Sequence, residues 1–290
     1  MGYNVPEGIT QATTSPRPDQ FAATAGAVLN DAGRRIASKD TIGIARVSWG
    51  NASAVASKGL ILGSSTFAGT GADTGKSEIE LFGAALQAAY PLDSGTHPTL
   101  WTQTLAQAAS SPPTVPGISI VNAAVGGVNS GNVLNTTSKN QIISYAPHWI
   151  MHSYWANDAS SGGINAAGTK ANILSWIAQI DAGYGAGLKP VHILVNPHAR
   201  GDQAWADGAA ALGETYESYR KTVATIVDDA PNKNVAFVDQ GLAFWAVGFQ
   251  GAINVNPRSM MDTASPTYVH LNNKGHRFGA DNLRLEIIGR

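Results

Sequence analysis

The sequence predicts an α/β fold in which five parallel strands form a sheet that helices cover on both faces. Five short runs are almost continuously apolar and are flanked by Gly, Pro or Asn, as is typical of strands buried on both sides. Segments with helical spacing lie between these runs, and such alternation favours a parallel sheet. The runs occupy residues 58–63, 118–122, 148–153, 191–196 and 235–239.

The helical segments are recognised by apolar residues that return every three or four positions. Ile173, Trp176, Ile177 and Ile180 fall on one helix face, and the same spacing continues through residues 216–227. Further helices are predicted at 77–89, at 99–109 and after residue 270.

The N-terminal part of the chain has a different character. Residues 1–20 are polar and interrupted by Pro, which indicates an arm with little structure of its own. The apolar stretch 42–50 could add a strand, although the pattern assigns it no role. We therefore divide the chain into an N-terminal arm with an added segment, residues 1–57, and a main domain, residues 58–290.

Composition restricts the classes of partner. The chain of 290 residues has a formal net charge of −1, and its basic residues form no cluster, so nucleic acid is not expected as a partner. Charged residues make up 13% of the chain, against about 25% in a typical soluble domain, which favours neutral hydrogen-bonding partners such as sugars. The chain contains no Cys, which excludes disulfides, thiolate nucleophiles and cysteine-based zinc sites. We expect neither a signal peptide nor a membrane helix, because no apolar run approaches the roughly 18 residues that a span requires.

The residues that follow the predicted strands define a candidate site. In parallel α/β sheets, ligands bind beyond the carboxyl ends of the strands. Ser65 follows the first run in a turn of small residues, Gly127 follows the second and Asn157 the third, while His270 precedes the last predicted helix. A hydroxyl, a glycine amide, a side-chain amide and an imidazole are the groups that acyl transfer needs as nucleophile, oxyanion donors and base.

In this order, the four residues resemble the SGNH (GDSL-type) hydrolase family, and the match extends over about residues 58–290. The most specific segment is His-Leu-Asn-Asn-Lys-Gly-His at 270–276. The resemblance implies a three-layer α/β/α fold of flavodoxin-like type with a five-stranded parallel sheet.

The resemblance also implies a role for each residue. Ser65 corresponds to the nucleophile of the family's Gly-Asp-Ser block, and His270 to the base of its Asp-x-x-His-Leu-Asn block. Gly127 and Asn157 correspond to the oxyanion glycine and the oxyanion asparagine.

The sequence departs from the family pattern at three positions. Ser64 replaces the Asp before the nucleophile, and Trp155 replaces the Gly of the third block. Thr267 stands where the family has the Asp that orients the imidazole of His270. The third triad member could be Asp262 or Thr267 itself. Alternatively, a backbone carbonyl could hold the other ring nitrogen in a Ser–His dyad, or the domain could be a non-catalytic sugar binder.

The function implied by the resemblance is that of a serine esterase working through an acyl-serine intermediate, without cofactor or metal. The low charge, together with Trp155 as a substrate-binding ring beside the site, favours O-acetyl groups of a carbohydrate or polysaccharide as the substrate. An extracellular, cell-surface or virion-associated location is favoured over a cytoplasmic one, and the oligomeric state is left open.

Two other classes of site receive less support from the sequence. Residues 69–77 resemble a phosphate-binding loop of a nucleotide hydrolase, but Thr70 stands where that pattern requires Gly. His270 and His276 are six positions apart, which does not place them on one helix face for a metal. His276 is instead predicted to form hydrogen bonds at the start of the last helix.

Overall fold

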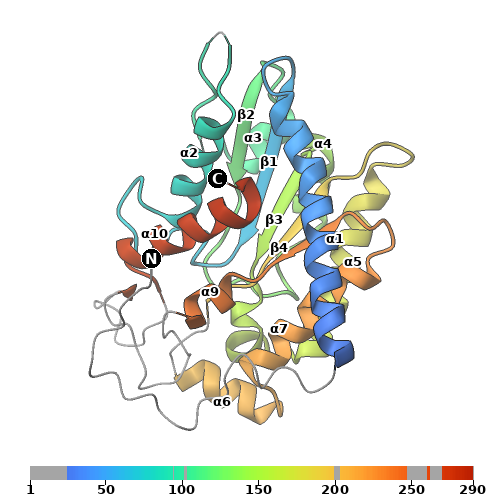
Figure 1. The fold of residues 1–290 in the computed structure, drawn as a ribbon, viewed down its shortest axis with the longest axis vertical. Helices are drawn as coiled ribbons and strands as arrows, with labels where there is room; N and C mark the ends of the chain where they lie inside the picture. Colours follow the sequence, from blue (N-terminus) through green and yellow to red (C-terminus); the bar gives the residue numbers. More distant parts are fainter. Residues whose placement is uncertain are drawn as a thin grey trace.

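Five parallel strands form one sheet through the centre of the molecule (Figure 1). The structure is a computed structural model that describes residues 25–93, 95–100, 103–198, 203–246, 260–261 and 270–289. The strand order is β2-β1-β3-β4-β5, and all neighbouring pairs are parallel, which confirms the predicted sheet. The strands are β1 (Ala56–Gly63), β2 (Gly117–Asn122), β3 (Trp149–Ser153), β4 (Val191–Val195) and β5 (Val235–Val238).

Helices cover both faces of this sheet and make the three predicted layers (Figure 1). One face carries α1 (Ala25–Gly50), α2 (Glu78–Ala89) and α10 (Asn273–Leu283), followed by a short π-helix, η5 (Arg284–Ile288). The other face carries α3 (Leu105–Ser110), α4 (Thr136–Tyr145), α5 (Ala166–Gly183), α7 (Tyr216–Ala224) and α8 (Ile226–Asp229). The remaining α-helices of the described residues are α6 (Gln203–Ala211) and α9 (Gln240–Ala246).

The strands are apolar along their whole length because both of their faces are buried. Ile61 packs into the core beneath α1, α2 and α10, whereas Leu60 and Leu62 pack into the core beneath α3, α4 and α5. Successive side chains of a strand point to opposite faces, so a strand between two helical layers needs an apolar residue at every position.

The prediction of a strand at 42–50 is wrong, because these residues form the last part of α1. Ile42, Ala45 and Trp49 are buried at helical spacing against the sheet, whereas Ile44 and Val47 are more than half exposed. The β-branched residues made the stretch look like a strand, but the buried positions repeat every three to four residues. These residues of α1 lie in the same core as β4 and β5.

Side-chain caps fix where several helices begin. The Ser77 hydroxyl accepts a hydrogen bond from the backbone N–H of Glu80, and the Glu80 carboxylate accepts one from the N–H of Ser77, which starts α2. Thr104 and Gln107 make the same capping box for α3, so this helix begins later than the predicted 99–109. Asn272 caps α10 and thereby fixes the segment just after His270.

Candidate active site

Ser65 lies in a tight turn at the carboxyl end of β1, a central strand of the sheet. The N–H of Ser64 still bonds the carbonyl of Ser153 on β3 at 3.0 Å, and the N–H of Thr70 donates to the carbonyl of Ser65 at 2.9 Å. A Cβ on Gly63 would lie 2.4 Å from the Cβ of Phe67, so only Gly fits at the start of this turn. Ser65 itself is partly exposed, as a nucleophile must be.

The loop after β2 runs beside this turn. The N–H of Val125 donates to the carbonyl of Gly63 at 2.9 Å and so extends the parallel pairing beyond the strands. A Cβ built on Gly126 would lie 3.9 Å from the Cβ of Ser65. Gly127 follows with a φ of +81° and open space around it. The predicted oxyanion glycine, Gly127, therefore directly follows the residue that lies beside Ser65.

Asn157 comes from the short 3₁₀-helix η2 (Trp155–Asn157) that follows β3. Its side-chain amide donates to the carbonyl of Val128 at 2.9 Å, and the residue is 7% exposed. The bond fixes the amide against the loop that contains Gly127. The structure thus brings the second and third predicted blocks together.

Asp158 joins the same two loops by a second and stronger set of contacts. It is completely buried, and its carboxylate accepts hydrogen bonds from the N–H of Ser130 at 2.7 Å and from the Ser130 hydroxyl at 2.6 Å. The hydroxyl of Thr169 on α5 is a third donor. Burial raises the pKa of the Asp158 carboxyl, although these hydrogen bonds oppose the rise. Asp158 opens the π-helix η3 (Asp158–Gly162) and was not predicted as a site residue, because an Asn-Asp pair after a strand is commonly a helix cap.

His270 lies against the loop that begins at Ser65. A Cβ on Gly71 would lie 3.3 Å from the Cβ of His270 and 2.3 Å from the carbonyl oxygen of Leu271. The neighbouring Asn272 donates its backbone N–H to the carbonyl of Met260 at 3.0 Å. His270 is partly buried, and its segment is held by the Ser65 loop on one side and by the start of α10 on the other.

His276 ties α10 to the Ser65 loop, as the sequence predicts for a residue near the helix start. Its Nε2 lies 3.1 Å from the carbonyl of Thr70, and its Nδ1 accepts the N–H of Glu78 at 3.2 Å. The ring is neutral, because one ring nitrogen donates a hydrogen bond and the other accepts one. Burial lowers the pKa of His276, which also favours the neutral form. His152 and His192 are also structural, since their buried rings bond each other at 2.9 Å.

Trp155 does not occupy the position predicted for a substrate-binding ring. It is 3% exposed, and its indole N–H donates to the side-chain oxygen of Asn196 at 3.4 Å. The ring also contacts Tyr154 edge to face. Because the turn of η2 directs this ring into the core, it presents no open face to a sugar. Asp262 and Thr267, the two candidates for a third triad member, lie outside the described residues.

The loop 69–77 lacks the features of a phosphate site. Lys76 pairs with Asp73 at 2.9 Å on the surface. Glu80 occupies the first turn of α2 and its carboxylate accepts the N–H of Ser77, at the position where a phosphate would require positive potential. Within the described residues, no three potential metal ligands are grouped to hold an ion, and no helix is both long and apolar enough to cross a membrane.

Comparison with known proteins identifies the family. A family model described as GDSL-like Lipase/Acylhydrolase matches residues 60–283, which is most of the chain. The chain therefore belongs to the GDSL-like lipase/acylhydrolase family, and it is an ester hydrolase by membership. This confirms the resemblance that the four sequence blocks indicate. No match was found among curated proteins.

Solved structures confirm the fold. The family 3 carbohydrate esterase of Clostridium thermocellum superposes with a TM-score of 0.52 at 17% identity, covering 81% of this chain and 96% of that one. The carbohydrate esterase family 3 protein from Talaromyces cellulolyticus gives 0.52 at 17% identity, covering 80% and 97%. The lipase/acylhydrolase from Enterococcus faecalis gives 0.50 at 17% identity, covering 81% and 96%.

Proposed function

We propose that this protein is a serine esterase that removes O-acetyl groups from a carbohydrate or polysaccharide through an acyl-serine intermediate. The observation that carries the proposal is the position of Ser65, partly exposed at the carboxyl end of β1. The Gly126 backbone lies on one side of it, and the loop from Ser65 leads to Gly71, which packs against His270.

The proposed chemistry uses these groups in two steps. His270 takes the proton of the Ser65 hydroxyl while the Ser65 oxygen attacks the acetyl carbonyl, and the developing oxyanion is stabilised by the backbone N–H groups of Ser65 and Gly127 and the amide of Asn157. The C–O bond to the sugar then breaks, and His270 returns the proton to the sugar oxygen. Water, deprotonated by His270, attacks the acetyl-serine and releases acetate and the free serine.

Two observations are consistent with a carbohydrate acetate as the substrate. Structures with the same fold include the two family 3 carbohydrate esterases and an esterase described as active on acetylated mannans, which has a TM-score of 0.52 at 14% identity. That alignment covers 82% of this chain and 50% of the esterase. The chain's own charged fraction of 13% is consistent with a neutral substrate surface.

The adjacent serines give a matched test. Ser65→Ala is expected to abolish hydrolysis of p-nitrophenyl acetate and acetate release from acetylated mannan. Ser64→Ala, which alters a buried neighbour in the same turn, should retain most of the activity. Loss in Ser64→Ala with retention in Ser65→Ala would overturn the nucleophile assignment. Binding of acetylated mannan by a wild-type protein that hydrolyses no ester would favour the non-catalytic alternative.

A further inference from the structure

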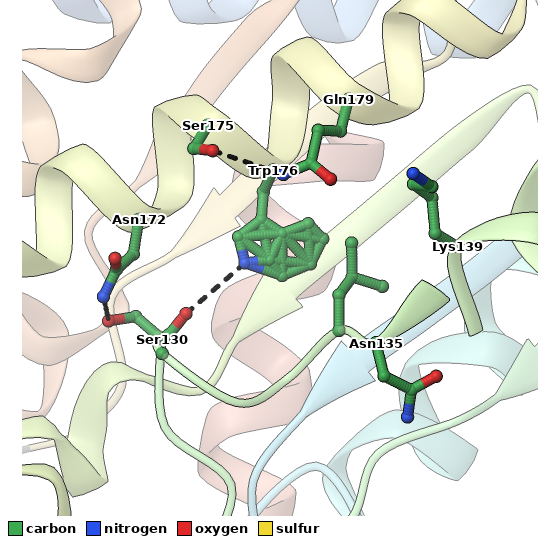
Figure 2. A pocket seen from close by; sticks show the side chains of 9 residues that line it. Ser130, Asn135, Lys139, Asn172, Ser175, Trp176 and Gln179 are labelled. Atoms are coloured by element: carbon green, nitrogen blue, oxygen red, sulfur yellow. Dashed lines mark hydrogen bonds between the residues drawn. The ribbon is translucent and has the colours of Figure 1, made fainter. Parts of the chain in front are cut away.

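A polar pocket is lined by residues 130–135 of the loop after β2, by Lys139 of α4 and by residues 172–179 of α5 (Figure 2). Its volume of about 280 Å³ is at the lower limit of small-molecule sites, which have about 300–1,000 Å³, and suits one compact residue of a longer ligand. Six polar side chains line it: Ser130, Asn135, Lys139, Asn172, Ser175 and Gln179.

The lining has the chemistry of a sugar site. Three amides and two hydroxyls supply donors and acceptors side by side, as adjacent hydroxyls on a pyranose ring require. Trp176 forms an apolar floor in the middle of these groups (Figure 2). The indole is only 4% exposed and stacks on Tyr154 with ring centroids 6.0 Å apart, so it forms a rigid base beneath the polar groups and, like Trp155, presents almost no open face to a sugar.

Lys139 supplies the one charge among the described lining residues. Within the described residues, the Lys139 ammonium group makes no ion pair or hydrogen bond, and no carboxylate lines the pocket. Figure 2 shows the Lys139 side chain at the edge of the pocket, opposite Asn172. A cation in this position can bond a sugar hydroxyl or pair with the carboxylate of an acidic sugar.

Hydrogen bonds connect the pocket to the proposed oxyanion residues. The Asn172 amide donates to the Ser130 hydroxyl at 3.0 Å, and that hydroxyl donates to Asp158 at 2.6 Å. Asp158 directly follows Asn157 in the chain. A ligand held by Asn172 would therefore lie against the same segment that positions the oxyanion donors.

We propose that this pocket binds one sugar residue of a polysaccharide, with Lys139 paired to a carboxylate where that residue carries one. The site is an accessory one, separate from the acetyl group at Ser65, and its part in substrate binding rests on the proposed esterase function. It would hold the polysaccharide against the catalytic face during successive deacetylation.

Calorimetric titration of the full chain carrying Ser65→Ala tests the pocket without turnover. The probes are a glucuronic acid trisaccharide and a neutral glucose trisaccharide, and binding of either one is expected. Adding Gln179→Ala should raise the Kd of the bound probe by about tenfold, because an amide that bonds a sugar contributes roughly that factor. Adding Lys139→Ala should remove any preference for the acidic probe.

Two matched variants control for nonspecific effects. Gln141→Ala lies on α4 outside the pocket lining, and Lys189→Ala removes a partly exposed charge beyond the end of α5. Both should leave the Kd within about twofold of the parent, as surface substitutions away from a site normally do. The proposal is overturned if neither probe binds, or if Gln179→Ala and Gln141→Ala bind alike. Residual esterase activity in the Ser65→Ala parent would instead refute the proposed nucleophile and leave the binding result standing.

Discussion

Gly71 approaches the carbonyl of Leu271 so closely that a Cβ on Gly71 would lie 2.3 Å from that oxygen. Real Cβ atoms do not come so near to backbone, so any larger residue must push the segment of His270 away. Gly75, in the same loop, has a similar positive φ of +77° but open space around it. The two glycines therefore separate the effect of contact from that of backbone strain.

Gly71→Ala is expected to lower kcat for p-nitrophenyl acetate by about 100-fold, because a displacement of the base by about 1 Å can cost that much. Gly75→Ala should cost about 1–2 kcal/mol of stability from its φ with little change in kcat. Steady-state kinetics and urea unfolding of both variants provide the comparison. Equal kcat values in the two variants would mean that His270 is not part of the reacting set.

Substitution of Asp158 tests how the loops that carry Gly127 and Asn157 are held together. Asp158→Ala leaves the buried N–H and hydroxyl of Ser130 and the hydroxyl of Thr169 without their acceptor, at about 1–3 kcal/mol for each group. We expect kcat to fall with little change in KM, since Asn157 would be held less firmly relative to Gly127 once the Asp158 contacts no longer supplement its bond to Val128. Asp158→Asn keeps one acceptor oxygen and should recover part of both stability and kcat.

Asp181 is the matched control for this effect. It is 2% exposed and bonds His192, Asn232 and Asn234 at the amino ends of β4 and β5, whereas Ser65 lies at the carboxyl end of β1. Asp181→Asn should reduce stability while kcat, measured well below the melting temperature, stays close to the wild-type value. If both aspartate variants lose stability and neither loses kcat, Asp158 supports the fold without positioning the oxyanion donors.

The five strands could be predicted because burial on both faces leaves a local mark, a continuous apolar run. Leu60, Ile61 and Leu62 each enter a core, on alternating sides, so no polar residue interrupts them. The end of α1 was misread because Ile44 and Val47 are apolar yet exposed, which hides the helical repeat of the residues that are buried. Exposed apolar residues are common on protein surfaces, and sequence alone does not distinguish them from core residues.

The residues of the site likewise include some that the sequence predicts and some that it does not. Ser65, Gly127, Asn157 and His270 could be proposed because each follows a strand or precedes a helix, and the order matches a family. The contact of Asp158 with Ser130 joins residues 28 positions apart and depends on how two loops meet in the folded chain. The burial of Trp155 likewise depends on the turn of η2, and an indole next to an active-site residue can point either way.

The partner of His270 can be identified by two substitutions. Asp262→Asn is expected to lower kcat by about 10³ to 10⁴, because a neutral partner no longer stabilises the imidazolium. If Asp262 is the partner, Thr267→Asp, which restores the family's residue, should raise kcat little. The opposite pattern, an unaffected Asp262→Asn and a faster Thr267→Asp, would indicate a dyad in which a backbone carbonyl holds the ring. Single-turnover rates with p-nitrophenyl acetate report on the acylation step directly.

The buried carboxyl of Glu78 is expected to make the stability of the protein depend on pH. The residue is completely buried at the start of α2, and its carboxylate accepts a hydrogen bond from Gln240 at 2.5 Å. Burial raises the pKa of Glu78 from 4.5 to about 8, and the Gln240 bond opposes the rise only in part. Between these two values the folded chain binds more protons than the unfolded chain, so stability falls as the pH rises through this window.

Glu78→Gln removes this titration and keeps an acceptor oxygen for Gln240. Relative to wild type, the variant should gain on the order of 3 to 5 kcal/mol in unfolding free energy between about pH 5 and pH 9. Urea unfolding at both pH values measures the gain, and Glu286→Gln, at an exposed position, is the control that should show none. A wild-type protein as stable at pH 9 as at pH 5, with Glu78→Gln no different, would show that the buried carboxyl is ionised without penalty in the folded state.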